Sequence, residues 1–228
     1  MGAALQLFRN LFMAGLLAGA LVACTSDEPA TNTTPETTLS EEARIRNRLL
    51  SETRDELKKW FRFYKLDAHA DTLFKLREVW EVSLLTFPVN DNWHELYQEH
   101  PKLFKPSPDK ATVLDIYTYE RVFDKKRRGK LAVAADSPDS EVAIVDPAKE
   151  EKTRLMFCGT PCQFDDAWWR SGSEVIVVGL VQETEQEYYP TLWHINLDTD
   201  TIRQYTATQA ANPDMKKNYL VDEVFDEL

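Results

Sequence analysis

The chain has 228 residues and a formal net charge of −11 at pH 7. So acidic a chain is a poor match for nucleic acid, because nucleic-acid binding rests on Lys and Arg contacts to phosphates. The same charge argues against electrostatic attachment to anionic lipid. Its hydrophobic fraction of 43% and aromatic fraction of 11% are those of a chain with a packed core, which excludes a wholly disordered protein.

The first 24 residues have the pattern of an export signal. One charge, Arg9, precedes an apolar run over residues 11–20, and Leu21-Val22-Ala23-Cys24 follows directly. The run is too short for a stable membrane anchor, and small residues before the cysteine suit cleavage by a signal peptidase. These four residues match the lipobox, so the N-terminus resembles that of bacterial lipoprotein precursors.

This resemblance implies that residues 1–23 are a signal peptide, that Cys24 is lipidated, and that the acyl chains hold the protein on a membrane. The alternative is an ordinary secretory peptide with an incidental cysteine. Thr25 stands where many lipoproteins of the inner membrane have Asp, so the resemblance implies an outer-membrane location, facing the periplasm or the cell surface. Ser26-Asp27-Glu28 resembles the surface-export signal of Bacteroidota lipoproteins.

Residues 24–40 predict a flexible tether. After Cys24 they read TSDEPATNTTPETTLS, which is rich in Thr, Pro and Glu and nearly free of large apolar side chains. Such a segment buries too little surface to offset the entropy lost on ordering. The folded part is therefore expected to start near residue 41.

Residues 41–105 predict a helical region. Ser40 is suited to cap a helix over 41–65, whose apolar residues recur at helical spacing. Residues 68–87 fit either a second helix or a strand, because both periodicities occur there. A short helix over 93–100 is expected after Asn92, and the proline-containing segment 102–110 is expected to link the helical region to the rest.

Residues 106–228 predict an antiparallel β-rich region that forms one domain with the helices. Its candidate strands are 112–119, 130–135, 141–145, 153–158, 166–169, 174–181, 188–197 and 201–206. Short gaps between them indicate antiparallel neighbours. The two halves of this β-meander are weakly self-similar, and each resembles one propeller blade, but two blades do not close a propeller. The predicted class is α+β, with one continuous sheet or two small packed sheets; a short helix is also expected within 214–228.

Two cysteines remain after Cys24, namely Cys158 and Cys162. An exported protein meets an oxidising compartment, and Gly159-Thr160-Pro161 permits a turn that brings the two close enough for a disulfide. Two buried thiols are the alternative. A metal or redox role has less support, since the spacing is unusual for redox pairs and no second ligand pair is near.

Catalytic and metal-binding signals are weak. Asp165-Asp166, with His194 on a facing strand, are the candidates for an acid–base pair, although a double Asp before a strand is common in turns. The four histidines lack metal-ligand spacing, and Asn196, Asp198 and Asp200 lack the Gly and Glu of a calcium loop. We therefore expect no metal and no cofactor.

Aromatic residues give the other candidate site. The binding candidates are Trp168, Trp169, Tyr188, Tyr189 and Trp193. Adjacent residues of a strand face opposite sides of a sheet, so one of each neighbouring pair is expected in the core and the other on the surface. An exposed ring on an envelope protein suits stacking on a glycan or docking of a partner protein. The alternative is that all five are core residues.

Taken together, these patterns favour an envelope lipoprotein that is a non-catalytic binding module for a glycan or a partner protein. The alternative function is an envelope hydrolase that uses Asp165, Asp166 and His194. A cleft in which His194 reaches a carboxylate would favour the hydrolase. An exposed aromatic strip would favour the binding module.

Overall fold

A computed structural model of the chain describes residues 40–66, 72–90, 92–125, 131–135, 138–211 and 218–225. These residues belong to one unit, Leu39–Leu228. The predicted signal peptide, lipobox and most of the tether lie outside the described residues. Within the described part of the chain, no helix is long and apolar enough to cross a membrane.

Two helices, α1 (Glu41–Glu52) and α2 (Arg54–Phe63), occupy the span in which one helix is predicted. Ser40 caps α1 as expected, since its side chain accepts a hydrogen bond from the Ala43 N–H at 3.2 Å. The break falls at Thr53, whose Oγ1 donates to the Leu49 carbonyl at 2.6 Å. Such side-chain bonding back to the preceding turn bends helices. Apolar spacing alone does not show this break.

The prediction that 41–105 is a helical region is wrong beyond α2. Residues 68–87 contain two strands, β1 (Phe74–Glu81) and β2 (Leu85–Pro88), and no second helix is described there. The short helix α3 (Trp93–Glu99) is present, although the Asn92 side chain makes no capping bond. The strands form because β1 pairs with residues 201–207, more than 100 positions later in the chain.

The predicted linker 102–110 begins in the core instead, and its later residues are mostly exposed. A 3₁₀ turn, η1 (Pro101–Leu103), leads into strand β3 (Phe104–Pro106). Leu103 and Phe104 are both buried in the hydrophobic core. The prolines that suggested a linker are compatible with this arrangement because β3 is an edge strand, where a missing N–H is tolerated.

Three antiparallel sheets hold the strands. Sheet A has the order β1-β12-β11-β10-β9, sheet B has the order β2-β8-β7-β4-β3, and β5 pairs with β6 alone. The remaining strands are β4 (Val113–Asp115), β5 (Arg121–Lys125), β6 (Leu131–Ala135), β7 (Ser140–Asp146), β8 (Glu151–Cys158), β9 (Cys162–Trp169), β10 (Glu174–Thr184), β11 (Glu187–Asn196) and β12 (Thr201–Ala207). A mixed fold with mostly antiparallel sheets is therefore confirmed.

The two halves of the β-rich region are not equivalent units. The expected repeat requires β6, β7 and β8 to be arranged like β10, β11 and β12. However, β6 pairs with β5 outside sheet B, and β7 pairs with β4 and β8.

The residues 220–224 form one π-helical turn, η2 (Leu220–Val224), within the segment for which a terminal helix is expected.

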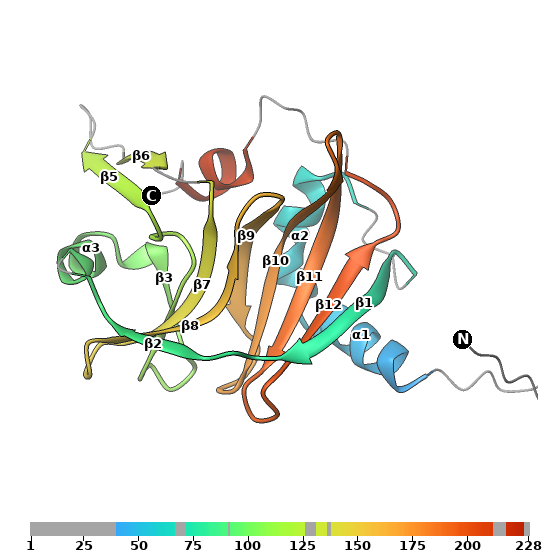
Figure 1. Cartoon of the computed structure of the whole chain (residues 1–228), viewed down its shortest axis with the longest axis horizontal. Coiled ribbons are helices and arrows are strands. Elements are labelled where there is room, and N and C mark those ends of the chain that lie inside the picture. Colours follow the sequence, from blue (N-terminus) through green and yellow to red (C-terminus); the bar gives the residue numbers. More distant parts are fainter. Residues whose placement is uncertain are drawn as a thin grey trace, which may run out of the picture. The chain divides into compact units, whose positions relative to one another are not determined.

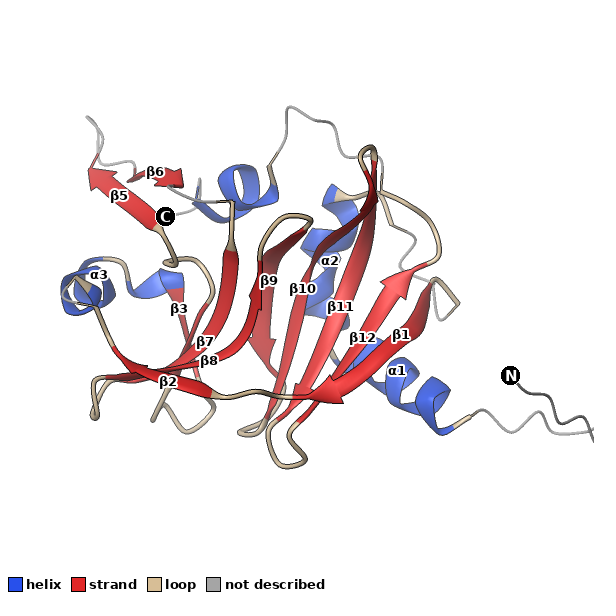
Figure 2. Ribbon diagram, in the orientation of Figure 1, coloured by secondary structure: helices blue, strands red, loops and turns tan. Residues whose placement is uncertain are grey.

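Sheet A lies between two other layers. On one face, Ile176 and Val178 of β10 pack with Leu57 and Trp60 of α2. On the other face, Val175 and Val177 pack with core residues of sheet B. Figure 1 shows α1 and α2 against the first of these faces, and Figure 2 shows the same layers by element type. Both faces of sheet A are therefore buried at β10, which explains the continuous apolar run of this strand.

Candidate functional site

Asp165 is the extra residue of a β-bulge. In the pairing of β9 with β10, Phe164 lies opposite Gly179 and Asp166 lies opposite Val178, which leaves Asp165 without a cross-strand partner. The bulge brings the two backbones close at Gly179, where a Cβ atom would lie 2.0 Å from the Gln163 carbonyl oxygen. Only glycine fits at position 179. The bulge re-aims the Asp165 side chain, as bulges commonly do.

The Asp165 carboxylate is fully buried and accepts three hydrogen bonds. Oδ2 accepts from Trp60 Nε1 and from the Tyr64 hydroxyl, both at 2.9 Å, and Oδ1 accepts from Gln163 Nε2 at 2.5 Å. Burial raises the pKa of Asp165 to about 6, the three hydrogen bonds oppose this, and the charge of Asp166 adds to it. Asp165 thus joins α2 to the edge of sheet A.

Asp166 has partners from the other layer. Its Oδ1 accepts from the Tyr117 hydroxyl at 2.6 Å and forms an ion pair with Lys105. Burial, together with the Asp166 charge, raises the pKa of Tyr117 well above its usual value. Both carboxylates are therefore occupied by donors of the protein itself, and together they connect α2, β9 and the β3–β4 segment.

His194 does not contact either aspartate. It lies opposite Ile176, which in turn lies opposite Trp168, so two strand spacings separate it from β9, about 10 Å. Its Nε2 is instead 3.2 Å from Glu174 Oε1, and Glu174 also forms an ion pair with Arg170. Burial lowers the pKa of His194, although Glu174 opposes the shift. The structure therefore does not assemble the predicted acid–base pair.

Of the three tryptophans among the binding candidates, Trp193 is buried, and Trp168 and Trp169 are half-buried. Trp193 is buried and meets Phe164 edge to face, with ring centroids 5.2 Å apart. Trp169 packs against the core between the sheets, and its Nε1 donates to the Lys105 carbonyl at 2.9 Å. Trp168 packs against the core under the helices, with Lys105 Nζ 4.9 Å from its ring centroid.

The two tyrosines are also half-buried rather than exposed. Tyr188 packs against the core under the helices, and Tyr189 lies opposite Val181. The alternation predicted for adjacent residues holds for the Trp168–Trp169 pair, since the two rings pack in different cores. Neither tryptophan of this pair is exposed, because other layers cover both faces of sheet A at β9.

Cys158 and Cys162 form a disulfide, with their Cα atoms 5.6 Å apart. The bond joins the end of β8 to the start of β9, and therefore links sheet B to sheet A across the turn at Gly159-Thr160-Pro161. Among the described residues, no group of three His, Cys, Asp or Glu side chains is arranged to hold a metal ion.

Sheet B exposes an aromatic surface that the sequence patterns did not single out. We call it the Arg154 surface, and its members are Leu85, Phe87, Tyr119, Arg154 and Phe157. The Arg154 guanidinium carbon is 4.8 Å from the ring centroid of Phe157, 5.3 Å from that of Phe87 and 5.7 Å from that of Tyr119. Phe87 is 39% exposed and Phe157 is 45% exposed.

Buried charges hold Arg154 in place. Its Nε donates to Glu141 Oε2 at 2.5 Å, and Glu141 Oε1 lies 2.6 Å from Lys152 Nζ. Lys152 also forms an ion pair with Asp115 at 3.2 Å. Burial lowers the pKa of Lys152, but the Asp115 and Glu141 carboxylates outweigh it, so the pKa of Lys152 is raised overall. The guanidinium is thus fixed before any ligand arrives.

Comparison with known proteins gives no precedent for this arrangement. The chain matches no protein-family model, no curated protein and no solved structure. Function therefore has to be inferred from the geometry of the residues themselves. Of the surfaces described so far, the Arg154 surface is the one that combines exposed rings with a charged group held by buried partners.

Sequence reasoning missed this surface for two reasons. The sequence predicts the strand over 153–158, and side-chain alternation along that strand is the one local signal for the position of Arg154. Phe87 lies in a segment that fits either a helix or a strand, and its position beside Arg154 depends on the pairing of β2 with β8. The buried acids Asp115 and Glu141 carry no local signal of burial.

Proposed function

We propose that the protein is an envelope lipoprotein, anchored through Cys24, whose folded part binds a partner protein through the Arg154 surface. The observation that carries this proposal is the pair of exposed rings, Phe87 and Phe157, on either side of a guanidinium fixed by Glu141. Aromatic residues and Arg are the side chains enriched in protein interfaces and in their energetic centres.

The neighbouring residues favour a protein over a glycan as the ligand. Leu85 is about half exposed and adds aliphatic carbon to the rings of the Arg154 surface. Leu85 lies opposite Arg154, so the two side chains share one face of sheet B. Aliphatic groups gain from burial against another protein, whereas a glycan needs hydrogen-bonding groups around its ring.

The edge of sheet B offers a second means of contact. β2 is the first strand in the sheet order, and its described partner is β8 on one side only. All four residues of β2 are exposed. An extended segment of a partner is able to pair with such an edge while its side chains meet the Arg154 surface.

The lipid anchor suits such a contact. A flexible tether of about 16 residues has a typical end-to-end distance of roughly 20–25 Å. The folded part would thus meet its partner close to the membrane. Replacing Cys24 with Ser is expected to move the protein from the membrane fraction to the soluble fraction. Continued sedimentation of C24S with membranes would contradict the lipobox interpretation.

Affinity capture tests the binding surface. The full chain, tagged and expressed in its native host, is recovered from solubilised membranes as wild type, as F87S/F157S and as a control, V122S/V221S. The control removes two apolar residues of similar exposure, Val122 and Val221, from other parts of the protein. We expect one protein to co-purify with the wild type and the control. Its recovery should fall at least about thirtyfold with F87S/F157S, as for loss of an energetic centre.

Two outcomes would contradict the proposal. One is a set of co-purifying proteins that is the same for all three forms, with melting temperatures also unchanged. The other is retention on an envelope polysaccharide, in affinity electrophoresis, that depends on Phe87 and Phe157 while no protein does. The second outcome would make the Arg154 surface a glycan site instead.

A further inference from the structure

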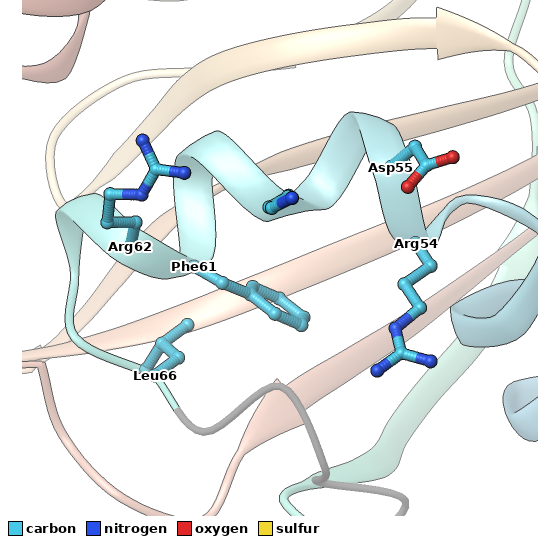
Figure 3. Close-up of a pocket in the computed structure, with 6 residues that line it drawn as sticks. Arg54, Asp55, Phe61, Arg62 and Leu66 are labelled. Atoms are coloured by element: carbon cyan, nitrogen blue, oxygen red, sulfur yellow. The ribbon is translucent and has the colours of Figure 1, made fainter.

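The exposed side of α2 lines a groove on the helical layer of the protein. The groove has a volume of about 470 Å³, and its lining residues are Arg54, Asp55, Lys58, Phe61, Arg62 and Leu66. Its volume is within the range of small-molecule sites, about 300–1,000 Å³. Figure 3 shows Arg54, Asp55, Phe61 and Arg62 on the helix and Leu66 just after it. The groove is distinct from the Arg154 surface, which belongs to sheet B.

Three cationic side chains lie on the side of α2 that lines the groove. Arg54, Lys58 and Arg62 are spaced four residues apart, so they share one face of α2, and all three are exposed. Each makes no hydrogen bond or ion pair through its side chain with another described residue. Asp55 is the one carboxylate among the described lining residues, so these residues carry a formal charge of +2 in a chain whose net charge is −11.

The floor of the groove is apolar. Phe61 is almost fully buried under α2, and Leu66 is half-buried just after the helix. In Figure 3 the Phe61 ring and the Leu66 side chain lie on the same side of the helix, while Arg54 and Arg62 lie toward its two ends. A ligand in the groove would therefore meet apolar carbon between two positive ends.

The spacing of the cations limits the shape of the ligand. Residues four apart in a helix are separated by about 6 Å along its axis, so Arg54 and Arg62 are about 12 Å apart. Inorganic phosphate is too small to contact both ends and leaves the apolar floor uncovered. An elongated organic molecule with an acid group satisfies the charge of the groove and also covers Phe61 and Leu66.

We propose that the groove on α2 binds an amphipathic organic anion, with its acid group on the Arg54–Lys58–Arg62 row and its apolar part on Phe61 and Leu66. The observations that support this are the row of cations, which have no partner among the described residues, the apolar floor and the volume of the groove. The ligand is defined by its chemistry, a phosphate or carboxylate head on an apolar chain, which is shared by lipid breakdown products and soluble metabolites. This site is independent of the proposed partner contact.

Titration calorimetry on the full chain tests the site with defined probes. The probes are dodecyl phosphate, inorganic phosphate and dodecyl maltoside, each below the concentration at which micelles form. The variant R54Q/R62Q is compared with R44Q/R48Q, which removes the same charge from exposed positions of α1 that do not line the groove. We expect dodecyl phosphate to bind one to one. R54Q/R62Q should weaken it about fivefold or more, while R44Q/R48Q should change it less than twofold.

Inorganic phosphate and dodecyl maltoside test the roles of the apolar floor and of the cations separately. Inorganic phosphate and dodecyl maltoside should each bind at least tenfold more weakly than dodecyl phosphate, because each lacks half of the required chemistry. Equal weakening by the two variants would overturn the site, since the effect would then come from net charge alone. Equal binding of dodecyl maltoside would overturn the role of the cations, and equal binding of inorganic phosphate would overturn the role of the apolar floor.

Discussion

Asp165 shows how one residue couples the helical layer to the sheet. Its carboxylate is buried where α2 meets β9 and holds the side chains of Trp60 and Tyr64. The hydrogen bonds favour the ionised form, yet burial outweighs them and raises the pKa to about 6. The protein therefore carries, at neutral pH, an ionised group that its own interior disfavours.

The raised pKa of Asp165 predicts a stability that depends on pH. The folded pKa of about 6 lies above the ordinary value of 3.8, so the contribution is fully present below pH 3.8 and is lost as pH rises through 6. The free energy of unfolding of the wild type minus that of D165N should fall by about 3 kcal/mol between pH 3.5 and pH 7. Urea unfolding of both proteins across this pH range measures this difference. A difference that does not change with pH would contradict the raised pKa of Asp165.

Gly179 predicts a large effect of a small substitution. Alanine at this position would place Cβ against the Gln163 backbone, so β9 or β10 must move and the bulge that presents Asp165 must distort. We expect G179A to lower the free energy of unfolding by about 2–3 kcal/mol. G172A is the matched control, because a Cβ at position 172 meets no other atom within 4 Å, and its effect should stay within about 0.5 kcal/mol. Similar urea midpoints for the two variants would contradict the close approach.

At the residue scale, sequence reasoning named several important positions but not their roles. Ser40 was recognised as a helix cap because capping is a local signal. Asp165 and Asp166 were singled out as a candidate acid pair with His194, but their partners are Trp60, Tyr64 and Tyr117, which come from distant segments. Burial and hydrogen bonding of this kind are set by tertiary packing, which the local sequence does not contain.

At the scale of elements, the disulfide links β8 of sheet B to β9 of sheet A. The cross-link closes a very short loop, so the chain-entropy model gives it about 2 kcal/mol of stabilisation. We expect the intact mass of the unreduced protein to be two hydrogens lower than after reduction, with Cys158 and Cys162 in one linked peptide. Free thiols that alkylate without a reductant would contradict this bond.

Strands of the β-rich region were easier to predict than those before it. The predicted strands 174–181, 188–197 and 201–206 match β10, β11 and β12 within a few residues, since apolar runs and turn residues mark them locally. The segment of β1 and β2 is ambiguous from sequence because helix and strand periodicities overlap there. Their partners, β12 and β8, decide the outcome, and both lie far along the chain.

At the scale of the molecule, the layering explains why the predicted binding strip is not on the surface. At β9 and β10, sheet A is covered by helices on one face and by sheet B on the other, so Trp168 and Trp169 are half-buried and each packs against a core. Sheet B has one face in the core between the sheets, and its exposed rings, Phe87 and Phe157, are on β2 and β8. The exposed rings Phe87 and Phe157 therefore belong to sheet B and not to sheet A, which has another layer on each face at β9 and β10.

Photo-crosslinking in living cells of the native host tests most directly whether the Arg154 surface holds a partner protein. A photoreactive residue replaces Phe157 in one form and Val221, an apolar residue of similar exposure away from this surface, in the other. The account predicts one discrete protein adduct from position 157 that position 221 does not give. No protein adduct from position 157, or the same adducts from both positions, would contradict it.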